Sequence, residues 1–170
     1  MYDYLIYFLV FSFLGWCAEV IFYAFKEHRF VNRGLARGPI CPIYGVGISL
    51  SYLMLRGVES FLALVLLSMA LTTLVEALVG VLTHKMLGVR LWDYRSERGN
   101  IGGYVCPRFS LLWGVISALI IRMIPRLDPL LELANDPRVV ALVFAFLILA
   151  FADTEREMIR IIRGDMKPKT

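Results

Sequence analysis

The stretch YLIYFLVFSFLGWCAEVIFYAF, residues 4–25, carries a single charged side chain, Glu19. About 20 consecutive apolar residues span the hydrocarbon core of a bilayer as a helix, so this stretch predicts a transmembrane helix. Residues 61–83 have the same character and again include one charged side chain, Glu76. The alternative is a buried helix of a soluble protein. It is disfavoured because a chain that is 59% hydrophobic has too little polar sequence left to cover such a core.

Three shorter apolar runs can cross the bilayer as well, provided that flanking arginines snorkel or the bilayer thins locally. We therefore expect an all-α, polytopic membrane protein with about five transmembrane helices, forming one integral membrane domain over residues 1–170. The first run is not a cleavable signal, because an acidic residue precedes it and the run is too long. The shorter runs are residues 40–55, 109–121 and 139–152.

Lysine and arginine are unevenly distributed between the connections. Four follow the first apolar run, five follow the third and five follow the fifth, which together make 14 of the 18. This alternation follows the positive-inside rule and predicts a cell membrane protein with an outside N-terminus and a cytoplasmic tail, residues 156–170. The net charge of +4 is thus a topology signal. We expect the lipid bilayer, and not nucleic acid, as the partner of the basic residues.

The motifs CPIY (41–44) and CPRF (106–109) each begin an apolar run. Each follows an arginine-rich loop with an asparagine, and before each loop lies a long run with a single glutamate. This echo predicts two parallel repeats, residues 4–56 and 61–126, related by an axis along the membrane normal, with the two Cys-Pro steps at similar depth. The alternative is coincidence, because proline suits the first helical turn.

Glu19 and Glu76 are the strongest functional candidates, because a charged side chain at membrane depth normally faces the protein interior and has a partner there. Three roles remain open. Each glutamate could pair with a loop arginine and only stabilise the fold, with Arg33 favoured over Arg37; the two could handle a proton or cation; or they could bind a substrate or act in catalysis. In the last two cases we expect both to flank one polar cavity.

Other familiar chemistry is missing from the sequence. It contains no Walker motif, nucleophile elbow or HExxH, and its three cysteines do not form CxxC pairs or predict a disulfide framework. His28 and His84 have no metal-ligand spacing, so we expect no metal and no cofactor, and whether the chain is an enzyme stays open. The segment LWDYRSERGN (91–100) could begin a short surface helix, with Asp93 capping it or pairing with an arginine.

Taken together, the motifs SFLGWCAEV, FVNRGLARGPICPIYGVG, LWDY and NIGGYVCPRFSLLWG resemble the ABC-transporter type IV membrane family, also called CmpB-like. The resemblance covers about residues 11–114 and implies a permease-like integral membrane protein. Because the chain is short for a permease and has no ATPase motif, a homodimer or a separate ATPase subunit is implied. Arg95 stands where the family tends to have a serine. The positions that match are Gly15, Trp16, Glu19, Asn32, Arg33, Gly34, Gly38, Pro39, Cys41, Pro42, Tyr44, Gly45, Glu76, Trp92, Asp93, Tyr94, Asn100, Gly103, Trp113 and Gly114.

Three hypotheses follow. The leading one is a transport-related, permease-like protein with a polar cavity open to the cytoplasmic face. The others are a membrane enzyme acting on a lipid or its headgroup at the cytoplasmic leaflet, and a non-catalytic scaffold. No residue is assigned as catalytic. The candidate residues for binding a substrate or ion are Glu19, Glu76, Arg33, Asn32, Asp93, Asn100, Cys41 and Tyr44.

Overall fold

The computed structural model describes residues 2–28, 39–131 and 136–163, and five α-helices make up most of them. Four of the helices are long and apolar enough to cross a membrane, and the other is a shorter apolar helix. The predicted all-α, polytopic membrane fold is confirmed. The helices are α1 (Tyr2–Glu27), α2 (Pro42–Leu55), α3 (Phe61–Leu87), α4 (Pro107–Leu131) and α5 (Pro137–Ile162).

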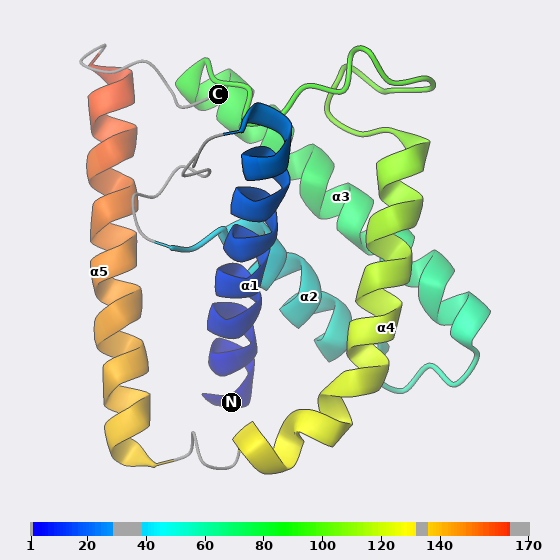
Figure 1. The fold of residues 1–170 in the computed structure, drawn as a ribbon, viewed down its shortest axis with the longest axis vertical. Helices are drawn as coiled ribbons and strands as arrows, with labels where there is room; N and C mark the ends of the chain where they lie inside the picture. Colours follow the sequence, from blue (N-terminus) through cyan, green and yellow to red (C-terminus); the bar gives the residue numbers. More distant parts are fainter. Residues whose placement is uncertain (1, 29–38, 132–135, 164–170) are drawn as a thin grey trace.

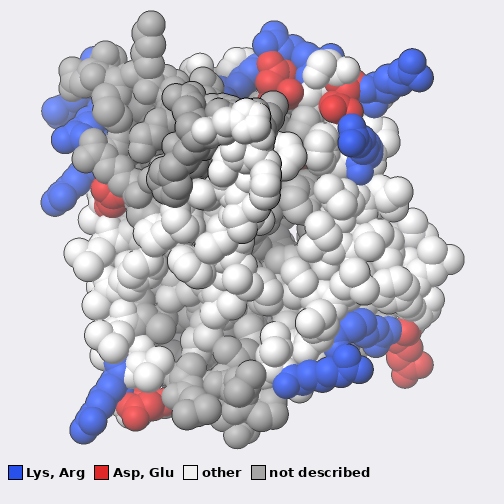
Figure 2. All heavy atoms as spheres, viewed as in Figure 1, with Lys and Arg blue, Asp and Glu red and all other residues white. Residues whose placement is uncertain are grey.

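The helices alternate in direction. In the view of Figure 1, α1, α3 and α5 run upward, and α2 and α4 run downward. Lysine, arginine and acidic side chains gather at the two ends of the molecule, and the face between them is almost entirely uncharged (Figure 2). This is the pattern expected of a protein whose middle lies in hydrocarbon and whose ends lie in the headgroup regions.

The first hairpin, α1 and α2, packs closely because small residues lie where the two helices meet. Gly45 of α2 lies so near Ser12 and the backbone of Phe8 that a Cβ there would collide with both. Farther down the pair, the rings of Tyr7 and Tyr52 meet edge to face with centroids 5.3 Å apart. Small residues let helix backbones approach in this way within a membrane.

The second hairpin, α3 and α4, uses the same kind of contact. A Cβ on Gly114 of α4 would lie 2.6 Å from Cβ of Met69 on α3. Ser60 caps the start of α3 by accepting a hydrogen bond from the backbone N–H of Ala63. At the same end of the molecule, the Arg122 guanidinium donates to the backbone carbonyls of Val58 (3.1 Å) and Glu59. The α3–α4 contact therefore fastens the second hairpin along its length, and Arg122 ties α4 to the α2–α3 turn that joins the two hairpins.

Helix α2 begins deep within the molecule. The backbone N–H of Cys41, its N-cap residue, donates to the carbonyl of Ser12 (2.9 Å), near the middle of α1. Because α2 has only 14 residues, it is about 21 Å long at 1.5 Å per residue. Non-helical backbone at this depth is tolerated where protein or a watery cavity surrounds it, and here α1 supplies the hydrogen-bond acceptor for it.

The two Cys-Pro steps do not lie at equal depth. Ser12 and Met69 are each seven residues before the glutamate of their helix. Gly45, which faces Ser12, lies four residues beyond the cysteine of its hairpin, whereas Gly114, which faces Met69, lies eight residues beyond. Relative to its glutamate, α2 therefore starts about one helical turn deeper than α4, and the prediction of equal depth is wrong.

Residues 88–106 form an ordered loop, and the short surface helix considered for residues 91–100 does not form. Gly88 ends α3 in a left-handed conformation (φ 67°), which glycine adopts without steric cost. An isolated bridge then pairs Ile101 with Val105 just before α4. The side chains of the loop bond to its own backbone and to α3, and this tertiary pairing replaces helix formation.

Helix α5 stands beside α1 with little of its surface covered (Figure 1). Its apolar side chains are strongly exposed, with Leu142 at 71% and Leu149 at 69%. In a membrane such a surface contacts lipid. Helix α5 continues past the last apolar run, residues 139–152, and ends at Ile162.

Candidate functional site

The first glutamate is held by a tyrosine at the entrance of α2. The hydroxyl of Tyr44 donates to Oε1 of Glu19 at 2.5 Å. Tyr44 lies in the first turn of α2, and its ring occupies the space that a side chain on Gly15 would fill. The glycine one turn before the glutamate therefore makes room for the ring that reaches it, and Cys41 sets the depth at which this ring enters.

The second glutamate is held by a tyrosine of the loop. The hydroxyl of Tyr94 donates to Oε1 of Glu76 at 2.9 Å. Glu76 is only 6% exposed, and its Oε2 atom has no hydrogen-bond partner. The ring of Tyr94 stacks on Phe109, with centroids 4.7 Å apart and planes 11° apart. Phe109 stands three residues after Cys106 as Tyr44 stands three residues after Cys41, but it has no hydroxyl, so the loop supplies one over its face.

The two glutamate–tyrosine pairs belong to one cluster, which we call the carboxylate cluster: Glu19, Tyr44, Glu76, Tyr94 and Trp113. The indole of Trp113 meets the Tyr44 ring edge to face at 5.3 Å and also lies beside Glu76. The negative charge of Glu19 reaches Tyr94 as well. The prediction that both glutamates flank one polar cavity stays a prediction.

Tyr94 is held in its protonated form. Burial raises the pKa of Tyr94 well above its usual value, and the charge and hydrogen bond of Glu76 raise this pKa further. The phenol therefore remains a donor to the carboxylate throughout the physiological pH range. A donor of this kind stabilises a carboxylate without cancelling its charge.

Neither glutamate forms an ion pair with a lysine or arginine in the part of the chain that the structure describes. Arg33, Asn32 and Arg37 lie outside the described residues, so the predicted pairing of Arg33 with a glutamate stays a prediction. The buried carboxylate of Glu76 needs a compensating positive group, because an isolated charge in a low-dielectric setting is strongly disfavoured.

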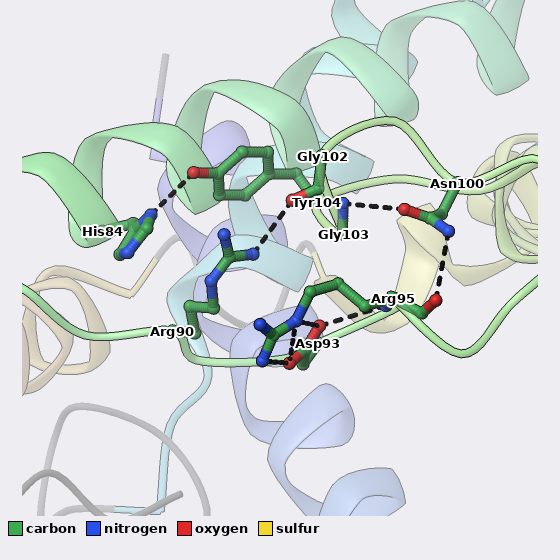
Figure 3. A network of polar contacts seen from close by, with 8 residues as sticks. All are labelled: His84, Arg90, Asp93, Arg95, Asn100, Gly102, Gly103 and Tyr104. Carbon is green, nitrogen blue, oxygen red and sulfur yellow. Dashed lines mark hydrogen bonds and ion pairs between the residues drawn. The ribbon is translucent and has the colours of Figure 1, made fainter.

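Two further predicted residues, Asp93 and Asn100, form hydrogen bonds within the loop of residues 88–106 (Figure 3). The Asp93 carboxylate receives hydrogen bonds from the Arg95 side chain at 2.5–2.9 Å, as one of the two sequence alternatives predicted. These bonds lower the pKa of Asp93 to about 2. Asn100 donates to the carbonyls of Glu97 and Arg95 and accepts from the N–H of Gly103. Neither side chain is bonded to a glutamate of the carboxylate cluster.

A second set of contacts fastens the loop to the end of α3. His84 Nδ1 and the Tyr104 hydroxyl lie 2.7 Å apart, and the Arg90 guanidinium lies 4.7 Å from the centroid of the Tyr104 ring (Figure 3). The Trp92 indole donates to the Tyr104 carbonyl at 2.7 Å. Among the described residues, no group of three or more His, Cys, Asp or Glu side chains could hold a metal ion.

Sequence reasoning did not include two members of the carboxylate cluster, Tyr94 and Trp113, among the candidate site residues. Tyr94 lies in the loop before α4, and its hydroxyl points into the cluster. The available signal was the missing hydroxyl of Phe109 at the position equivalent to Tyr44. Trp113 lies one helical turn beyond Phe109, and the one-turn offset between α2 and α4 brings it to the level of Tyr44.

The model of the family described as "Putative ABC-transporter type IV" matches residues 6–156. The chain belongs to this family. The resemblance proposed from residues 11–114 is thereby confirmed and extends further in both directions. No curated protein and no solved structure matches the chain. With its membrane-spanning helices, this member of the ABC-transporter type IV family is a multi-pass, transport-related membrane protein.

Proposed function

We propose that this protein is the permease-like membrane subunit of a transporter, in which Glu19 and Glu76 bind the transported substrate or a coupling ion. The observation that carries the proposal is that glutamates of two different helices belong to one cluster, joined through the Tyr44–Trp113 contact, without a basic partner among the described residues. Ionisable groups at membrane depth are rare and usually mark a pathway for a substrate or ion. The predicted polar cavity, open towards the loop of residues 88–106, is part of this proposal.

The two predicted repeats support the same proposal. In residues 4–56 and in residues 61–126, a long helix carries one glutamate that accepts a hydrogen bond from a tyrosine hydroxyl. In each unit a Cys-Pro step then starts the next helix. Transporters built from repeats place their binding sites where the repeats meet, which is where Trp113 contacts Tyr44.

The orientation we propose puts the N-terminus outside and the loop of residues 88–106 in the cytoplasm, together with the tail 156–170. It rests on the excess of lysine and arginine at that end of the molecule. In a background without native cysteines, Asp136→Cys should react with a membrane-impermeant maleimide on intact cells, and Arg98→Cys should react only after permeabilisation. The opposite labelling would overturn the orientation.

A separate ATPase subunit, or a second copy of this chain, would complete the transporter. This follows from the family and from the missing Walker motif in the given sequence. A transporter of this class would need ATP hydrolysis to act against a gradient, whereas binding to the membrane subunit would not. Binding is therefore the step that the protein alone should perform.

The proposal can be tested with purified protein in liposomes on a solid-supported membrane. Concentration jumps of cationic, anionic and zwitterionic compounds should produce charge displacement with at least one class. Glu19→Gln and Glu76→Gln should abolish it, while Glu59→Gln, an exposed glutamate in the α2–α3 turn, should not. Full signals from both cluster variants would contradict the proposal. Loss of the folded protein in both would instead support a structural role.

A further inference from the structure

The carboxylate cluster combines two negative charges with several aromatic rings. Tyr44 and Trp113 form an edge-to-face pair, and Tyr94 lies stacked on Phe109 in the same region. A cation over the face of Trp, Tyr or Phe is attracted by the quadrupole of the ring. Carboxylates next to such rings attract the same cation by charge, so both kinds of group favour one type of ligand.

One oxygen of the cluster lacks a partner. Oε2 of Glu76 makes no hydrogen bond, although the side chain is only 6% exposed. Leaving a buried acceptor of a charged group unsatisfied is costly, and native structures rarely do so without a functional reason. An incoming ammonium group would neutralise the charge, and one that carries an N–H would also donate a hydrogen bond to this oxygen.

We propose that the carboxylate cluster binds a monovalent organic cation, a protonated or quaternary amine, between Glu19 and Glu76 and against the aromatic rings. This inference rests on the proposed function and names the substrate class of that site. The half-buried members Glu19, Tyr44 and Trp113 form its accessible side, and Glu76 lies behind them under Tyr94. Binding displaces or tilts Tyr94, whose hydroxyl occupies Oε1 of Glu76 in this structure.

The chemistry of the cluster disfavours the other ligand classes. Hard cations such as Ca²⁺ take six to eight oxygen ligands, and no group of three metal-ligating side chains exists among the described residues. An anion would meet two carboxylates. An uncharged ligand would leave both carboxylates without compensation, which is the cost that the cation removes.

Two ligands of nearly the same shape test the charge directly. Choline and its uncharged isostere 3,3-dimethylbutan-1-ol differ by replacement of nitrogen with carbon, and tetraethylammonium provides a second quaternary probe. Binding to the detergent-solubilised protein is measured by isothermal titration calorimetry. We expect choline or tetraethylammonium to bind and the isostere not to bind. Equal binding of choline and its isostere, or no binding of either quaternary ammonium ion, would overturn the inference.

Variants locate the ligand. Glu76→Gln and Trp113→Leu should each weaken binding by about tenfold or more, and Glu59→Gln should leave it unchanged. Each loss of binding counts only if the thermal unfolding midpoint in detergent does not fall. If Glu76→Gln does not fold, Glu76→Asp is measured in its place. Unchanged affinity in Glu76→Gln would exclude the carboxylate cluster as the site.

The outcomes separate this inference from the proposed function. If an anionic or zwitterionic compound gives charge displacement that depends on Glu19 and Glu76, the transport role stands and the cation class is wrong. If no compound gives a signal and choline does not bind, both are wrong. Choline binding that needs Glu76, without charge displacement by any compound, keeps the site and removes transport by this chain.

Discussion

The two hairpins solve the same problem with different parts of the chain. In the first, the hydroxyl that holds Glu19 comes from Tyr44, in the first turn of the helix that follows the Cys-Pro step. In the second, Phe109 occupies the equivalent position, and the hydroxyl that holds Glu76 comes from Tyr94 in the preceding loop. The Tyr94 ring stacks on the Phe109 ring with centroids 4.7 Å apart. The loop therefore brings a hydroxyl over the ring that has none.

The difference shows that the tyrosine bonded to the carboxylate can come from different places in the chain, either from the following helix or from the loop before it. The first hairpin places its tyrosine by starting α2 deep beside Ser12. The second begins α4 about one turn higher and compensates with a longer, self-bonded loop. The first arrangement depends on close helix packing and the second on the fold of the loop, and each can be disturbed without the other.

The largest expected effect is on function, from Glu19→Gln and Glu76→Gln. Both should abolish charge displacement, but their effects on stability should differ. Glu76→Gln should leave the thermal unfolding midpoint unchanged or raise it, because it removes a buried charge with an unpartnered oxygen. Glu19 is half-buried, so its replacement should change the midpoint little. A large drop for Glu76→Gln would indicate a structural ion instead.

The next largest effect concerns helix packing. It can be measured by comparing two glycines of α2, one in close contact with α1 and one not. Gly45→Ala should lower the free energy of unfolding by about 1–3 kcal/mol, because the new Cβ meets Ser12 and the Phe8 backbone. Gly47→Ala meets no atom within 4 Å and should be neutral or slightly stabilising. Unfolding in detergent at increasing denaturant measures both, and equal effects would contradict the close α1–α2 packing.

Moving the hydroxyl from residue 94 to residue 109 within the second hairpin tests how the carboxylate bond is made. Tyr44→Phe and Tyr94→Phe each remove a bond to a carboxylate, for which about 1.5–3 kcal/mol of stability is typical. If the ring of residue 109 can take over the missing bond, the double variant Tyr94→Phe/Phe109→Tyr should recover part of the loss. Phe109→Tyr alone serves as the control. No recovery in the double variant would mean that the loop ring is needed for more than its hydroxyl.

The smallest effect concerns the loop itself. Because the hydrogen bonds from Arg95 lower the pKa of Asp93 to about 2, their contribution to loop order is present above the ordinary pKa near 4 and is lost as pH falls through about 2. Fluorine NMR of a label at Arg98→Cys should therefore report a constant environment from pH 7 to about pH 4 and a change below it. Asp93→Asn should abolish that change. A transition near neutral pH would show that another group controls the loop.

The sequence predicted the fold class and the helices, and it named Glu19 and Tyr44 as candidate residues without predicting their contact. Single charges in long apolar runs predicted α1 and α3 well, because length and hydropathy suffice for a membrane span. The one-turn offset of α2 could not be predicted, because it depends on the contact of Gly45 with Ser12 across two helices. The role of Tyr94 could not be predicted for a similar reason, since a loop tyrosine reaches Glu76 only through the tertiary fold.

The hairpin arrangement also bears on how the protein is made. The residues that hold each carboxylate lie within its own hairpin, with separations of 25 residues for Glu19–Tyr44 and 18 residues for Glu76–Tyr94. During biosynthesis, a glutamate entering the bilayer on one helix thus needs only the next stretch of nascent chain to acquire its hydrogen-bond donor. The two hairpins can insert one after the other, each with its polar bond already made, and Trp113 joins them at the end. A membrane insertase would never have to hold an unpartnered carboxylate for long.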